Sequence, residues 1–218
     1  LQNGVTQIQH NNMGTYTGPD IITDGLLFAY DAGSERCYPG SGTSTTNIES
    51  QASPGTLQNG VGFSSANGGV CAMECWIYWI NDNRSIMLGN FDQGSGGHDI
   101  NFEKLSSNQL RFYWDRGSRD VTTSGSVVAQ NAWQFVTFVR DTSANEFRFY
   151  VNGAIVNTTA NAGSNITSTG TTFRIGADTR DGDPVLNGNM ASVRMYSQAL
   201  TTAEALQNYN AQKSRFGL

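Results

Sequence analysis

Several aromatic and charged side chains in this sequence are spaced as a sugar-binding surface would require. Trp and Tyr rings stack on the C–H faces of sugars, while carboxylates and guanidinium groups hydrogen-bond to the hydroxyl groups. Alternation along a strand over residues 110–115 would place Arg111, Tyr113 and Asp115 on one face, with Arg116 at the strand end. An earlier strand carries two more aromatic side chains on one face. The predicted ligand-binding residues are therefore Trp76, Tyr78, Arg111, Tyr113, Asp115 and Arg116.

Each of these predictions competes with an interpretation that needs no ligand. Trp76 and Tyr113 are large enough to be buried in the packing of the sheet, and for Trp76 we favour burial. Arg111 and Asp115 are equally suited to an internal ion pair. The two interpretations differ in which faces of the strands are exposed.

A second group of side chains suits a cation. Asp178, Asp181 and Asp183 lie within six residues, in a loop that also contains Gly182. Hard carboxylate oxygens brought together in such a loop are ligands that Ca²⁺ prefers, so this loop is the predicted calcium site. The alternative is a solvated acidic turn whose charge is partly neutralised by Arg180.

Residue patterns for catalysis are missing from the expected strands. A glycosidase needs two carboxylates that face each other across the scissile bond, but Glu74 is the only carboxylate on its strand. A Ser-His-Asp site is not indicated, since His10 lies in a polar arm and His98 in a Gly-rich loop. We therefore predict that the protein is not an enzyme.

Composition restricts the partners. The net charge is −5 and the 13 Lys and Arg residues are scattered, whereas nucleic-acid binding requires clustered positive charge. The sequence contains no apolar run long enough to cross a bilayer, so insertion into a membrane is not expected. A neutral polar ligand such as a sugar, or another protein, fits this composition better. Its low charge and many Thr and Asn residues are also compatible with a homo-oligomer.

Strand-like segments recur at short intervals and are separated by turn residues. We expect strands over residues 26–30, 70–80, 85–88, 99–103, 110–115, 133–140, 146–151, 172–175 and 190–196. Thr201 and Glu204 have the spacing of a capping box, which predicts one short helix near the C-terminus. The pattern predicts an all-β fold, a two-sheet antiparallel jelly-roll sandwich with a single C-terminal helix. Residues 1–23 are expected to form an extended N-terminal arm, and residues 24–218 the domain.

Four segments, taken in order, resemble a known family. They are residues 73–77, 133–140, 147–153 and 186–204, of which the third ends in the turn dipeptide Asn152-Gly153. The series resembles the laminin G-like, concanavalin A-like lectin/glucanase superfamily and extends over residues 24–212. The resemblance implies a jelly-roll, a core position for Trp76, and a Ca²⁺ ion at the rim of the sandwich in some members.

The opening of the domain, residues 24–33 and 38–43, resembles such domains in virion proteins of tailed phages. Those openings usually continue with a Trp and a Ser-Gly-Asn-rich stretch, which residues 46–50 replace here. The resemblance implies a head-decoration, tail or fibre protein on the virion surface. Its arm would contact other virion or assembly proteins, and its jelly-roll would bind surface polysaccharide of the host. The alternative is a carbohydrate-binding module of a secreted or cell-surface protein, with or without dependence on Ca²⁺.

Overall fold

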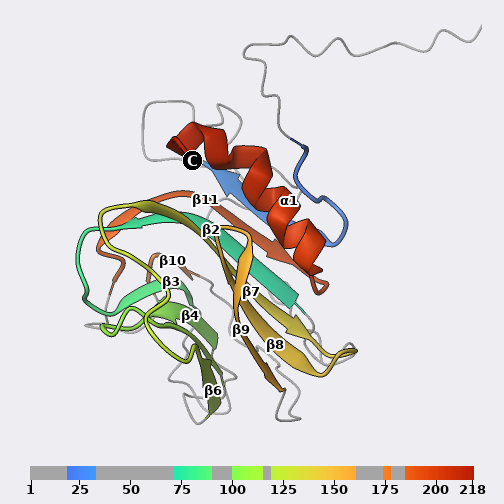
Figure 1. The fold of residues 1–218 in the computed structure, drawn as a ribbon, viewed down its shortest axis with the longest axis horizontal. Coiled ribbons are helices and arrows are strands. Elements are labelled where there is room, and N and C mark those ends of the chain that lie inside the picture. Colours follow the sequence, from blue (N-terminus) through green and yellow to red (C-terminus); the bar gives the residue numbers. More distant parts are fainter. Residues whose placement is uncertain (1–18, 33–70, 90–99, 115–118, 161–173, 178–184) are drawn as a thin grey trace, which may run out of the picture.

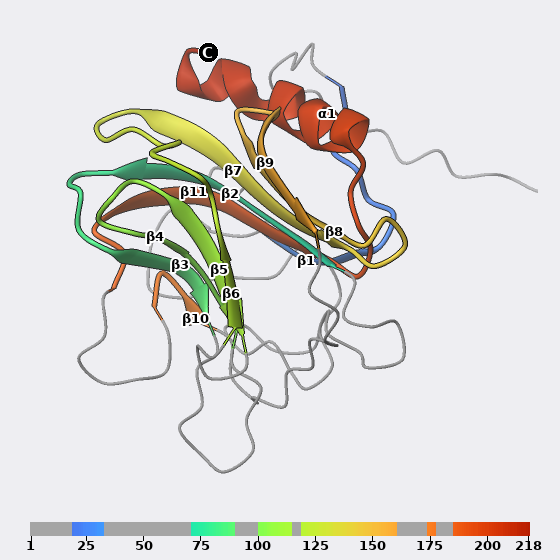
Figure 2. The ribbon, with the colours of Figure 1, turned by 60° about the horizontal axis from the view of Figure 1, so that its bottom comes forward.

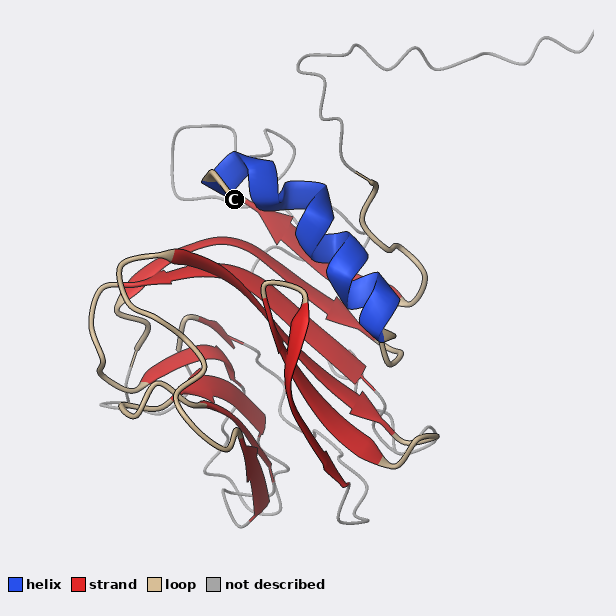
Figure 3. Ribbon diagram, in the orientation of Figure 1, coloured by secondary structure: helices blue, strands red, loops and turns tan. Residues whose placement is uncertain are grey.

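The fold is a sandwich of two antiparallel sheets with one helix on its outside (Figure 1; Figure 3). The computed structural model describes residues 19–32, 71–89, 100–114, 119–160, 174–177 and 185–218. The predicted all-β jelly-roll sandwich with a C-terminal helix is confirmed. Its elements are β1 (Leu26–Asp31), β2 (Cys71–Trp79), β3 (Ser85–Gly89), β4 (Ile100–Lys104), β5 (Leu110–Trp114), β6 (Arg119–Thr122), β7 (Trp133–Asp141), β8 (Glu146–Val151), β9 (Ala154–Ala160), β10 (Arg174–Ile175), β11 (Gly188–Tyr196), α1 (Thr202–Gln212) and the 3₁₀ helix η2 (Lys213–Phe216).

The strands divide into a larger and a smaller sheet. The six-stranded sheet has the order β1-β11-β2-β7-β8-β9, and the five-stranded sheet has the order β10-β3-β4-β5-β6. The two sheets face each other, and α1 lies on the far side of the six-stranded sheet (Figure 2). Each sheet therefore has one face on the core and one outer face. Among the described elements, a helix covers the outer face of the larger sheet and none covers that of the smaller sheet.

Alternating side chains of both sheets fill the space between them. On β2 the face with Cys71, Met73, Cys75, Ile77 and Trp79 is fully buried in this core, as its alternation predicts. Phe138 of β7 stacks on Phe112 of β5 with ring centroids 4.0 Å apart, so the two sheets meet through aromatic rings.

Local turn and cap residues form as the sequence predicts. Asn145 and Asn152 adopt positive φ values of 57° and 52° at the two hairpin turns. At the start of α1, Thr201 Oγ1 accepts a hydrogen bond from the Glu204 backbone N–H, while the Glu204 carboxylate accepts one from the Thr201 N–H. Strands β6 and β9 were not among the predicted elements.

Gly188 of β11 lies against the backbone of β2, and its replacement should weaken the sheet. A Cβ atom at this position would lie 2.0 Å from the carbonyl oxygen of Tyr78 on β2. Because that neighbour is backbone, Gly188→Ala should lower the free energy of unfolding by about 1–3 kcal/mol in urea denaturation. Gly125→Ala is the matched control, since a Cβ there meets no atom within 4 Å. Equal stability of the two variants would contradict this packing.

Candidate functional site

The outer face of the six-stranded sheet is closed by α1 and η2. Trp76, which the alternation of β2 assigns to this face, is fully buried. Its ring stacks on Phe216 of η2 at 4.0 Å between centroids and on Tyr209 of α1 at 5.7 Å. The rings of α1 and η2 therefore cover Trp76, which was predicted to bind a ligand. Trp76 is a packing residue, as the alternative interpretation held, and has no exposed ring face for a sugar.

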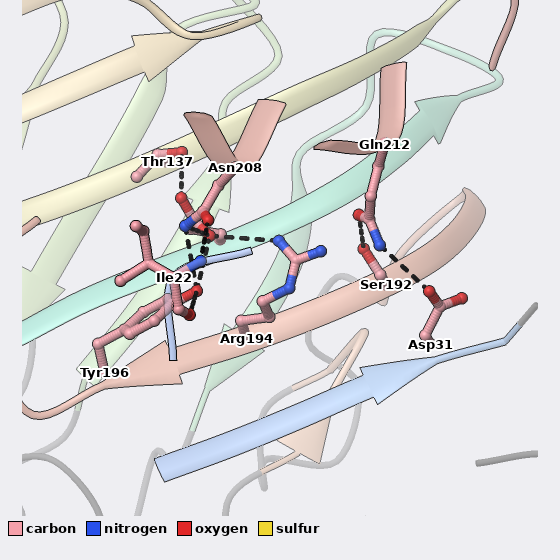
Figure 4. A network of polar contacts seen from close by, with 9 residues as sticks. Ile22, Asp31, Thr137, Ser192, Arg194, Tyr196, Asn208 and Gln212 are labelled. Carbon is pink, nitrogen blue, oxygen red and sulfur yellow. Dashed lines mark hydrogen bonds and ion pairs between the residues drawn. The ribbon is translucent and has the colours of Figure 1, made fainter. Parts of the chain in front are cut away.

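Glu74 lies at the centre of a polar network under the same helix. Figure 4 labels its partners Thr137, Arg194, Tyr196 and Asn208. Its carboxylate accepts hydrogen bonds from Asn208 Nδ2 at 2.9 Å, Arg194 Nη1 at 3.3 Å and Tyr196 OH at 3.4 Å. Thr137 Oγ1 donates to the other carboxylate oxygen at 3.3 Å. One buried carboxylate thus joins β2, β7, β11 and α1.

Burial also changes the acidity of this carboxylate. Loss of hydration raises the pKa of Glu74 from 4.5 to about 7, although the Arg194 guanidinium and the hydrogen-bond donors around it lower the pKa in part. The same burial, together with the nearby carboxylate, raises the pKa of the Tyr196 hydroxyl. Because Glu74 is fully buried, this unusual acidity is a property of the fold and not of a solvent-accessible acid.

The segment that leads into the domain is held by the same network. Ile22 N donates to Asn208 Oδ1 at 2.7 Å, and the Ile22 carbonyl oxygen accepts from Tyr196 OH at 3.2 Å. Gln207 Nε2 of α1 donates to the Asp20 carbonyl oxygen at 2.8 Å. Residues 20–22 therefore lie against α1, although the sequence assigned them to the arm.

A second polar cluster continues this contact toward the C-terminus. Gln212 Oε1 accepts from Ser192 Oγ at 3.3 Å, and Gln212 Nε2 donates to Asp31 at 3.2 Å (Figure 4). Arg215 forms a bidentate ion pair with the Asp31 carboxylate at 2.5 and 2.9 Å. These contacts hold both α1 and η2 against the edge strand β1. The side chains of Gln212 and Arg215 therefore stabilise the fold.

The outer face of the five-stranded sheet carries a different arrangement, an ion triad of Arg84, Glu103 and Arg111. The Glu103 side chain has no exposed surface, whereas the Arg84 and Arg111 side chains are 29% and 28% exposed. One carboxylate oxygen accepts from Nε and Nη2 of Arg84 at 2.8 and 2.7 Å, and the other accepts from Nε and Nη2 of Arg111. The buried carboxylate therefore fixes two half-exposed guanidinium groups on this face.

The ring of Tyr113 packs against the Arg111 guanidinium of this triad. The Arg111 guanidinium carbon lies 5.1 Å from the centre of the Tyr113 ring, and the Tyr113 hydroxyl accepts a hydrogen bond from Asn101 Nδ2. Tyr113 is only 3% exposed, so its predicted role as a sugar-stacking ring is wrong for this arrangement. Its ring orients Arg111 instead.

The structure separates the predicted ligand-binding residues. Tyr78 is half-buried beside the Trp133 ring at 5.8 Å between centroids, on the outer face of the six-stranded sheet. Arg111 and Tyr113 lie on the outer face of the opposite sheet, so Tyr78 does not share a site with them. Five of the predicted residues lie outside the described part of the chain. They are Asp115 and Arg116 for the sugar, and Asp178, Asp181 and Asp183 for calcium.

Sequence reasoning missed Arg84 and Glu103. Glu103 pairs directly with Arg111 across β4 and β5, but only the strand register reveals this. Arg84 precedes β3 in a turn and reaches Glu103 from the other side. The sequence offered one signal for this ion pair. A Glu and an Arg lie eight residues apart, on two consecutive predicted strands.

The described residues show no cluster of metal ligands and no helix that could span a membrane. Among these residues, no three His, Cys, Asp or Glu side chains are placed to hold a metal ion. In the same residues, no helix has the length and apolar character to cross a membrane.

Sequence and fold both have relatives among known proteins. A family model described as "Concanavalin A-like lectin/glucanases superfamily" matches residues 41–205 of the chain. No curated protein sequence matches it.

Solved structures share the fold at low identity. Domain 4 of AbnA, a GH43 extracellular arabinanase from Geobacillus stearothermophilus in complex with arabinotriose, is 16% identical with a TM-score of 0.58, over 84% of this chain and 98% of that one. The CBM40 of the Ruminococcus gnavus IT-sialidase, bound to α2,3-sialyllactose, is 12% identical with a TM-score of 0.52, over 69% and 92%. Trypanosoma rangeli sialidase in complex with sialic acid is 16% identical with a TM-score of 0.54, over 88% of this chain and 34% of that one.

Proposed function

Because the chain belongs to the concanavalin A-like lectin/glucanase superfamily, we propose that it is a non-catalytic carbohydrate-binding domain. The proposed site is the outer face of the five-stranded sheet around Arg84, Glu103 and Arg111. Several structurally similar proteins carry sugars in their structures, among them arabinotriose and α2,3-sialyllactose, which supports this class of ligand.

The proposed site is assigned to the smaller sheet because the outer face of the larger sheet is covered. The outer face of the six-stranded sheet is covered by α1 and η2, and its central aromatic residue Trp76 is fully buried. On the smaller sheet, Arg84 and Arg111 keep more than a quarter of their side-chain surface exposed. Guanidinium N–H groups held in a fixed orientation suit the hydroxyl and carboxylate oxygens of a glycan.

Two buried carboxylates on the described strands support the non-catalytic part of the proposal. Glu74 is buried under a helix, and both oxygens of Glu103 accept hydrogen bonds from arginine. A glycosidase needs one carboxylic acid that gives a proton and a second carboxylate facing it across the bond. A reducing-sugar assay on β-glucans should therefore show no release above the protein-free control, and sustained release would contradict this assignment.

Direct binding is the test of the proposed function. Calorimetric titration of a panel of neutral and acidic polysaccharides should give saturable heat with at least one of them. The experiment is performed with and without Ca²⁺, because we also propose that Asp178, Asp181 and Asp183 hold this ion. Calcium binding predicts a higher melting temperature in Ca²⁺ than in chelator, and the difference should vanish in Asp181→Asn. Absence of heat with every polysaccharide under both conditions would reject the carbohydrate-binding assignment.

We further propose that this domain sits on the surface of a phage virion, with an extracellular binding module as the alternative. The resemblance of its opening segment to tailed-phage proteins motivates this proposal. Bonds from Asn208 and Gln207 to residues 20–22 would give the preceding arm a fixed origin on α1. The whole protein should co-sediment with gradient-purified particles, and deletion of residues 1–18 should abolish attachment while leaving the melting temperature unchanged. Recovery only in soluble fractions would exclude the virion role.

A further inference from the structure

The ion triad on the outer face of the five-stranded sheet contains more positive than negative charge. Two arginines, Arg84 and Arg111, surround the single buried carboxylate of Glu103, which gives the triad a net charge of +1. The chain as a whole has a net charge of −5 and Asp120 adds one negative charge to the same face, so the positive charge is confined to the guanidinium groups of the triad. A positive site of this kind selects for a ligand that brings a negative charge.

Arg111 has an unused edge for such a ligand. Its Nε and Nη2 atoms bind Glu103, and its guanidinium plane lies over Tyr113. Within the described residues, Arg111 Nη1 makes no hydrogen bond, so the edge formed by Nη1 and Nη2 remains available. That edge presents two parallel N–H groups, the arrangement that matches the two oxygens of a carboxylate.

A carboxylate that can accept hydrogen bonds from sugar hydroxyl groups lies on the same face as this edge. Asp120 of β6 is directly opposite Tyr113 in the register and therefore shares the face of Arg111. It is exposed, and its carboxylate accepts a hydrogen bond from Thr122 at 3.0 Å. A carboxylate can accept hydrogen bonds from sugar hydroxyl groups but repels an anion, so Asp120 favours a ligand with a single carboxylate and neighbouring hydroxyls over a densely charged one.

We propose that this site binds a sugar that carries a carboxylate, with the carboxylate on the Nη1/Nη2 edge of Arg111 and ring hydroxyls toward Asp120. The inference rests on the proposed carbohydrate-binding function and specifies its ligand class. Uronic acids and nonulosonic acids share this chemistry.

Binding of matched polymers to the full chain tests the proposal. The probes are polygalacturonate, its methyl ester, polysialic acid, dextran sulfate and a neutral glucan. We expect the wild-type protein to bind polygalacturonate or polysialic acid more tightly than the methyl ester and the glucan, by on the order of 10- to 100-fold. Comparison of polygalacturonate with polysialic acid shows whether the site prefers a uronic acid or a nonulosonic acid.

Substitution of Arg111 should remove this preference. Arg111→Gln keeps an amide donor for Glu103 but loses the charged edge, so affinity for the acid should fall by on the order of 10- to 100-fold while affinity for the methyl ester stays within about twofold. Arg111→Lys should restore only part of the affinity, because an ammonium group cannot bind both oxygens in one plane. The control is Arg148→Gln, which breaks an ion pair to Asp141 on the other sheet and should leave binding unchanged.

The outcomes separate the two levels of the proposal. Equal binding of acid and methyl ester, or equal loss of both in Arg111→Gln, would overturn the carboxylate preference while carbohydrate binding stands. Tighter binding of dextran sulfate than of either acid would overturn it as well, because the site would then respond to charge density alone. Absence of binding to every polymer would reject the carbohydrate-binding function itself. Melting temperatures of all variants identify any loss that comes from unfolding.

Discussion

Glu74→Ala should lower the free energy of unfolding by about 3–5 kcal/mol at a pH near 8. The carboxylate is fully buried and accepts hydrogen bonds from Thr137, Arg194, Tyr196 and Asn208. Its removal leaves the Arg194 guanidinium, whose side chain is only 3% exposed, as a buried charge without its counterion. Urea denaturation followed by circular dichroism measures the change.

Glu74→Gln is the matched variant for this prediction. The amide oxygen can accept from Asn208, Arg194 and Tyr196, while the amide nitrogen faces the Thr137 hydroxyl, which is able to accept. The Gln variant should therefore be considerably more stable than the Ala variant. If both variants lose the same free energy of unfolding, the hydrogen bonds around Glu74 do not contribute to stability.

The pH dependence of stability provides an independent check on the same residue. Burial raises the pKa of Glu74 from 4.5 to about 7, so the folded protein holds this proton more tightly than the unfolded chain. The resulting stabilisation is fully present below a pH of about 4.5 and is lost as the pH rises through about 7. The difference in unfolding free energy between wild type and Glu74→Gln should therefore fall by about 3 kcal/mol between pH 4 and pH 8. A difference that stays constant with pH would mean that Glu74 does not titrate in this range.

Trp76→Ala should cost about 3–5 kcal/mol of unfolding free energy and leave ligand affinity unchanged. The indole packs between Phe135 of the sheet and the rings of Tyr209 and Phe216 on the helix side, so truncation leaves a cavity under α1 and η2. The proposed ligand site is on the opposite face of the sandwich, with a whole layer of core between them. Calorimetric unfolding and polysaccharide titration of the same preparation measure both quantities.

Trp76→Phe separates packing from hydrogen bonding at this position. The indole Nε1 makes no hydrogen bond to any described residue, so a phenyl ring retains the stacking on Phe216 without losing one of these polar contacts. We expect a cost of only about 1 kcal/mol. Arg111→Gln should show the reverse pattern, with affinity lost and a smaller loss of stability, because Glu103 keeps Arg84 as its ion-pair partner. If Trp76→Phe lost affinity for the sugar while its stability was unchanged, Trp76 would belong to the ligand site.

Local structure could be predicted from the sequence because it depends on neighbouring residues. Alternation of apolar residues over residues 70–80 identified β2 and the face that it buries. Asn152-Gly153 marked a turn because these residues tolerate positive φ, and Thr201 with Glu204 marked the start of α1 because their side chains satisfy its first backbone N–H groups. Strand β9 was missed because its exposed, polar side chains at the sheet edge lack alternation.

The two faces of β2 and the partners of its side chains were decided only by the tertiary structure. Both faces carry large residues, so periodicity could not show that α1 would cover one of them and bury Trp76. Glu74 meets Asn208 across 134 residues, and Arg111 takes Glu103 as its partner through the register of β4 and β5. Such contacts depend on sheet order and on where the helix packs, which follow from burying apolar surface in the whole chain and not from any local pattern.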